Sequence, residues 1–163
     1  MDDELEIRAI PAKEFKQVTD ALMRHGDKKV IRREIAKELR SALRPYAARA
    51  KGGIMAMHSS GGHGGVPLRA SIARKVTPQT MLTARKTGVR IKVGKTPNIR
   101  KFALAGRYTN RRSWRRPVYG RAWIIQRGKP GWFDDVMEAS ESSARKAVAN
   151  AMETVIRKIR GMK

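Results

Sequence analysis

The distribution of charge along the chain constrains its structure more than any other feature of the sequence. Residues 39–133 contain no Asp or Glu, and they carry 22 of the 37 Lys and Arg residues of the 163-residue chain. The remaining 15 basic residues face 14 acidic ones, so the two ends of the chain are nearly balanced. Because the cations of this acid-free segment have no carboxylate close in the sequence, they must face water, an acidic surface or nucleic acid.

The net charge of +23 favours a protein that approaches a polyanion, although charge of this size can also serve solubility alone. The sequence has no Cys, which excludes disulfides, thiolate metal sites and a cysteine nucleophile. The first residues are acidic, unlike those of a signal peptide. The longest stretch without a charged residue, residues 52–68, holds six Gly. We therefore expect no membrane span and no membrane partner, and synthesis in the cytoplasm.

Hydrophobic periodicity predicts two helices in the N-terminal part and one at the C-terminus of a single domain covering residues 1–163. The first helix spans residues 11–24, and the second starts at Lys28 and reaches Ala50 unless Pro45 kinks or ends it. The third starts at Asp134 and stops at Gly161. Its predicted apolar stripe consists of Val136, Ala139, Ala144, Ala147, Val148, Ala151, Val155 and Ile159.

The rest of the chain is predicted to contain loops and short strands. Residues 1–10 form an acidic tail, and residues 51–67 form a flexible Gly-rich loop before a short helix at 68–75. Residues 81–86 and 89–93 alternate around Thr87-Gly88, which is typical of a hairpin, and a further strand is expected at 122–126. In this hairpin Val89, Ile91 and Val93 face the core. Residues 95–113 read as loop with a turn of helix near 102–104.

This order of elements predicts an α+β fold. Long N- and C-terminal helices would pack on a small antiparallel sheet, with the Gly-rich loop beside them.

No group of residues predicts an enzyme. His58 and His63 share the Gly-rich loop, but no third metal ligand is close in the sequence. Asp134 and Asp135 open a helix, where carboxylates complement the helix dipole more often than they bind Mg²⁺. We predict no catalytic residue, no metal site and no cofactor.

The most specific basic cluster surrounds a tryptophan. Four arginines bracket Trp114, and arginine binds phosphate in a bidentate manner. Trp114 itself either stacks on a base or anchors local packing. No sequence-reading nucleic-acid motif is present, so we expect contacts to the phosphate backbone only. The candidate DNA-proximal cations are Arg90, Lys92, Arg111, Arg112, Arg115 and Arg116.

The stretch from Ser113 to Phe133 resembles a signature of the tail-completion, or head–tail joining (neck), family of long-tailed bacteriophages. The pattern reads SWRRPVYGR, then WIIQ, then KPGWF, followed by a long C-terminal helix; Arg116 stands where many members have His. The signature residues are Trp114, Pro117, Gly120, Trp123, Gln126, Pro130, Gly131, Trp132 and Phe133. We expect turns at Pro117–Gly120 and Pro130–Gly131, and aromatic side chains that lock helix to sheet.

The resemblance implies a structural protein of the virion, located at the head–tail junction and made in the host cytoplasm. It implies a homo-oligomeric ring, six-fold in many neck and tail proteins, with neighbouring neck and tail proteins as partners and viral double-stranded DNA in its lumen. The same cations would otherwise bind acidic surfaces of those neighbours. The alternative is a free, sequence-independent nucleic-acid-binding protein of ribosomal or nucleoid type, which the charge also suits.

Overall fold

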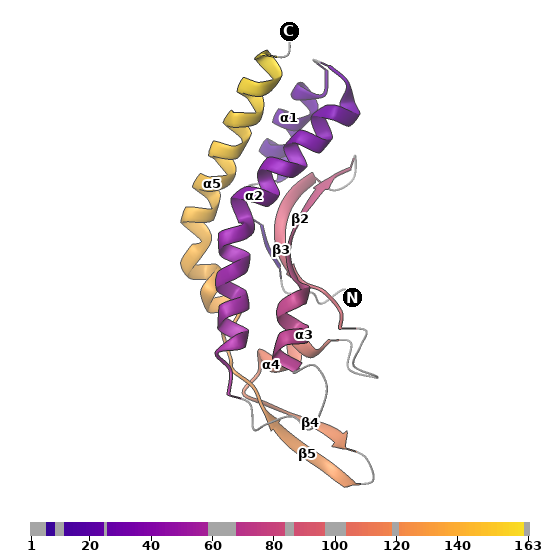
Figure 1. The fold of residues 1–163 in the computed structure, drawn as a ribbon, viewed down its shortest axis with the longest axis vertical. Coiled ribbons are helices and arrows are strands. Elements are labelled where there is room, and N and C mark those ends of the chain that lie inside the picture. Colours follow the sequence, from indigo (N-terminus) through magenta and orange to yellow (C-terminus); the bar gives the residue numbers. More distant parts are fainter. Residues whose placement is uncertain are drawn as a thin grey trace.

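The computed structural model describes residues 6–8, 12–24, 26–58, 68–83, 87–96, 104–118 and 121–161. Most of the predicted Gly-rich loop, together with His63 and Gly120, lies outside these residues. The molecule is elongated, with the end of the C-terminal helix at one extremity and a two-stranded hairpin at the other (Figure 1).

Two long helices, α2 (Lys28–Met55) and α5 (Asp134–Gly161), lie side by side along the molecule (Figure 1). Helix α2 also contacts the larger sheet, so it forms the middle layer between α5 and that sheet. Its apolar residues recur every three or four positions and supply much of the core. The buried residues of α2 are Ile31, Ile35, Leu39, Leu43, Tyr46, Ala47, Ala50 and Ile54.

Helix α2 is longer than predicted. Pro45 lies inside it without ending it, and the helix continues five residues into the segment predicted as loop. The reason is burial, because Ala50 and Ile54 prolong the apolar periodicity and are fully buried. At the other end Asp27 caps the helix, since its Oδ1 accepts hydrogen bonds from the backbone N–H of Lys29 (2.7 Å) and of Val30 (3.4 Å).

The buried face of α5 also differs in part from the predicted stripe. Ala139 is exposed, and Val136 and Ala147 are only half-buried. The long side chains of Met137 and Met152 are buried instead, because they fill more space in the core than the neighbouring alanines. The predicted residues Ala144, Val148, Ala151, Val155 and Ile159 are buried.

The larger sheet is antiparallel, in the order β1 (Glu6–Arg8), β3 (Thr87–Val93), β2 (Val76–Leu82). Strand β1 lies within the segment predicted as an acidic tail. The predicted turn at Thr87-Gly88 is wrong, since both residues belong to β3 and Thr87 pairs with Leu82. The strand β2 therefore begins earlier, at Val76, which is fully buried opposite Val93. As predicted, Val89, Ile91 and Val93 face the core.

The remaining elements lie around these layers. Helix α1 (Ala12–Leu22) contacts β3 and buries Phe15 and Leu22, whereas Val18 is exposed. Helix α3 (Leu68–Lys75) has the predicted bounds, and α4 (Ala105–Thr109) begins just after the predicted helical turn.

A second, two-stranded sheet is formed by β4 (Ser113–Val118) and β5 (Arg121–Arg127), which includes the strand predicted at 122–126. The α+β prediction, with long helices and small antiparallel sheets, is confirmed.

Candidate nucleic-acid interface

The six cations predicted to lie near DNA divide between the two sheets. Arg90 and Lys92 alternate with the buried residues of β3 and therefore lie on the other face of the larger sheet. Arg90 Nε donates a hydrogen bond to Gln79 Oε1 at 3.1 Å. The second group, Arg111, Arg112 and Arg115, lies at the start of β4 and is exposed.

The arginines before β4 are backed by aromatic packing. The Arg111 guanidinium carbon lies 5.4 Å from the centre of the Tyr108 ring, within the range of a cation–π contact. Trp114 is only 7% exposed, so its position supports the packing role rather than stacking on a base. Arg116 belongs to β4, and its side chain lies outside the described part of the structure.

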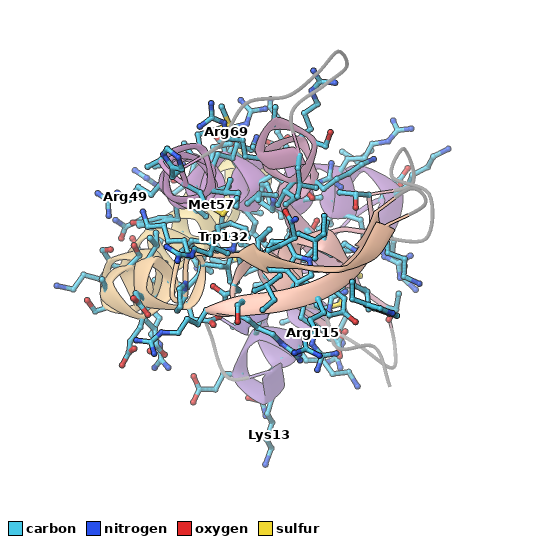
Figure 2. The ribbon with its side chains drawn as sticks, turned by 90° about the horizontal axis from the view of Figure 1, so that it is seen from below. Lys13, Arg49, Met57, Arg69, Arg115 and Trp132 are labelled. Carbon is cyan, nitrogen blue, oxygen red and sulfur yellow. The ribbon has the colours of Figure 1, made fainter. Side chains whose placement is uncertain are left out.

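The end of the family-like signature forms an aromatic plug. Trp132 and Phe133 are each 1% exposed, and their rings meet edge to face with centroids 5.6 Å apart. Trp132 lies between the ends of α2 and α5 (Figure 2). The expected turn at Pro130–Gly131 is present, and Gly131 has a left-handed φ of +72°. These residues hold the start of α5 against α2, as expected of packing residues.

The two faces of the β4–β5 hairpin differ in exposure, and burial on the first face is confined to the region of Trp114, since Ile124 on the same face is 36% exposed. Trp114 pairs with Gln126, which is half-buried, whereas Arg115 pairs with Ile125 on the opposite face. On this open face Trp123 is 65% and Ile125 60% exposed. Trp123 therefore does not lock helix to sheet, which corrects the expectation for this signature residue. Pro117 lies in β4 and not in a turn, next to a register irregularity between Arg116 and Val118.

The structure also contains a cation-rich surface that the sequence analysis did not select. An open groove of about 870 Å³ runs between α2 and the end of β2. We call it the basic groove; of its eleven lining residues in the described part of the chain, seven are Lys or Arg and one is acidic. The lining residues are Asp27, Lys28, Lys29, Arg32, Arg33, Ala36, Lys37, Arg40, Arg44, Thr80 and Leu82.

The groove is basic because the acidic residues of α2 form ion pairs with α5 on another flank of the helix. Lys158 of α5 donates hydrogen bonds from Nζ to Glu34 Oε1 at 2.5 Å and to Glu38 Oε1 at 2.6 Å. The hydrogen bond from Lys158 holds the pKa of Glu34 below its ordinary value, and the two carboxylates raise the pKa of Lys158. A linear count of charges reads residues 1–38 as balanced, with nine basic and nine acidic residues. Placing the residues of α2 around a helix shows that Glu34 and Glu38 share one flank, and this signal was present in the sequence.

Other kinds of site find no support in the described residues. They contain no cluster of three His, Asp or Glu side chains of the kind that binds a metal ion. Among the helices in the described ranges, none combines the length and the apolar character needed to cross a bilayer. Comparison with protein-family models found no match, and searches of curated proteins and of solved structures found none either.

Proposed function

We propose that the protein is a structural component of a tailed-phage virion that acts in head–tail joining or tail completion. It would form a ring, six-fold by analogy with other neck and tail proteins, at the head–tail junction around the DNA channel. Neighbouring neck and tail proteins would be its partners, with contacts to viral double-stranded DNA through phosphates alone. The resemblance of residues 113–133 to the neck family motivates this proposal, and the buried plug of Trp132 and Phe133 before a long helix is compatible with it.

The observation that carries the proposal is the open face of the β4–β5 hairpin. The hairpin extends from one end of the molecule (Figure 1) and exposes Trp123 and Ile125 beside Arg115 and Arg127. Exposed Trp is costly in a soluble monomer, and Trp and Arg are enriched at the energetic centres of protein interfaces. A face of this composition suits a protein whose role is to join other subunits.

Native mass spectrometry of the purified chain tests the proposal. We expect rings or ring fragments in the wild type and monomers in Trp123→Ser, because the change removes an exposed apolar anchor without disturbing the core. Val18→Ser is the matched control, since Val18 is also an exposed apolar residue, 40% accessible on α1. A wild-type chain that remains monomeric at every concentration, alone and with neighbouring virion proteins, would contradict the proposal.

The basic groove favours one alternative, a free nucleic-acid-binding protein of ribosomal or nucleoid type. This alternative predicts that monomers coat free duplex DNA tightly and with steep salt dependence, and that the protein is absent from particles. Assembly of the chain into rings, together with its presence in virus particles, would distinguish the virion role from this alternative.

A further inference from the structure

We infer that the basic groove is the surface that binds the phosphate backbone of duplex DNA, in place of the cations near the Trp114 cluster. The choice of DNA as the polyanion rests on the proposed function. The choice of surface rests on the structure alone, and Arg32, Arg33, Arg40 and Arg44 are the groove's principal phosphate ligands.

The first argument is charge balance within the groove. Asp27, its only acidic lining residue within the described ranges, already accepts hydrogen bonds from the first backbone N–H groups of α2. The opposite wall, made by Thr80 and Leu82, belongs to the acid-free segment and supplies no carboxylate. Seven cations therefore share one open surface, to which the described lining residues contribute a single carboxylate. A polyanion supplies further counter-charge and relieves their mutual repulsion.

The second argument is the spacing of the cations. They extend from Lys28 to Arg44 along a single helix, a rise of about 24 Å at 1.5 Å per residue. Each DNA strand rises about 3.4 Å along the duplex axis per phosphate and also winds around that axis, so a straight row of this length reaches only some of the phosphates that it passes. A row of cations on one rigid helix suits an extended polyanion, whereas a compact cluster would better suit a single small anion.

The third argument concerns residue type. The four arginines are all exposed, and an arginine side chain binds a phosphate in a bidentate manner while staying fully charged. The lining residues that the structure describes include no Asn, Gln or aromatic side chain suited to reading a base edge or stacking on a base. The groove is therefore suited to binding that does not depend on DNA sequence, as a channel through which DNA passes requires.

The test measures binding of a fluorescent random-sequence 20-base-pair duplex by the full chain between 50 and 300 mM salt. The groove variant combines Arg32→Gln, Arg33→Gln, Arg40→Gln and Arg44→Gln. We expect it to reduce the slope of log K against log salt by about 3 to 4, and affinity at 0.1 M salt by more than about 100-fold. Circular dichroism and thermal unfolding establish that the variant is folded.

A matched control removes four charges from exposed cations of α5. It combines Arg145→Gln, Lys146→Gln, Arg157→Gln and Arg160→Gln, and its slope should stay within about 1 of the wild-type slope. A third variant, with Arg111→Gln, Arg112→Gln and Arg115→Gln, tests the surface predicted from the sequence and should also bind nearly as the wild type does.

The inference is overturned by any of three results. The wild type fails to bind DNA at any salt concentration, the α5 control loses as much affinity as the groove variant, or only the third variant loses affinity. Native mass spectrometry of the same proteins without DNA separates this inference from the proposed function. Rings with groove-independent DNA binding refute the groove alone, whereas groove-dependent binding by a chain that never assembles refutes the head–tail role alone.

Discussion

Gly131 holds a left-handed backbone conformation immediately before the buried pair Trp132 and Phe133. Its φ of +72° is one that L side chains rarely adopt, and a Cβ at this position would overlap the Asp135 carboxylate. Its carbonyl oxygen also accepts a hydrogen bond from the Asp135 backbone N–H at 3.1 Å. This turn therefore sets the direction in which α5 leaves the second sheet.

Replacing Gly131 by Ala should lower the free energy of unfolding by about 1–2 kcal/mol, chiefly from the left-handed conformation, because the exposed Asp135 carboxylate can rotate away from the added Cβ. Urea denaturation followed by circular dichroism measures the change. Gly52→Ala is the control, because Gly52 is helical with nothing within 4 Å of an added Cβ, and should raise stability by about 0.5–1 kcal/mol. Equal effects of the two substitutions would show that the turn does not depend on glycine.

At the scale of the elements, the ion pairs of Lys158 join the outer flanks of α2 and α5. The pKa of Glu34 is lowered from its ordinary value of 4.5, chiefly by the hydrogen bond from Lys158. A carboxylate with a lowered pKa stabilises the fold above its unfolded pKa, and that stability is lost as pH falls through the folded pKa. The raised pKa of Lys158 acts in the opposite range, since its contribution is lost only as pH rises through a value above 10.5.

Lys158→Met should therefore lower the free energy of unfolding at neutral pH, and its stability should converge with that of the wild type below pH 4.5. Denaturant titrations between pH 3 and pH 8 measure the two curves. Arg145→Met removes the exposed pair with Glu141 on the same helix and should leave the shape of the curve nearly unchanged. Parallel curves of stability against pH for the wild type and Lys158→Met would show that these ion pairs contribute nothing to the loss of stability at low pH.

Periodicity predicted the elements that bury a regular apolar face. Helices α2 and α5, the short α3 and the inward residues of β3 all follow from spacings of three, four or two. The errors in the predicted elements occurred where contacts between distant parts of the chain determine the local structure. Strand β1 has only three residues and exists because β3 pairs with it, and α2 continues through Gly52 and Gly53 because Ile54 is buried.

The candidate site was predictable only in part. The acid-free segment led to Arg111–Arg115, which stays a prediction, whereas five of the seven groove cations lie before that segment on α2, whose acidic residues mask its charge in a linear count. Helical spacing places Glu34 and Glu38 on one flank of α2, but the partner of that flank, Lys158, lies more than 100 positions away in the sequence and is shown by the structure alone.

At the scale of the whole molecule, the net charge of +23 is distributed unevenly among surfaces. The described acidic side chains lie mainly on α1, on the flank of α2 that meets α5, and on α5 itself. The basic groove lies on the other side of α2, beside β2. The described part of the molecule therefore presents charge-balanced and strongly basic surfaces in different directions, which suits contacts with unlike neighbours within one assembly.

The same distribution predicts that salt stabilises the free chain. Screening weakens repulsion between exposed cations that lie farther apart than the Debye length, which is about 10 Å at 0.1 M salt and shorter at higher salt, and the groove concentrates seven cations. The melting temperature should rise between 20 and 500 mM NaCl, by about 2–4 °C for each kcal/mol of repulsion relieved in a chain of this length.

The four-arginine groove variant should melt higher than the wild type at low salt and respond less to added salt. The α5 control variant loses the same number of charges but leaves the groove intact, so it should retain most of the wild-type response. If the melting temperature instead falls with salt in all three proteins, favourable ion pairs outweigh repulsion in the folded state. Repulsion among the groove cations then does not destabilise the fold.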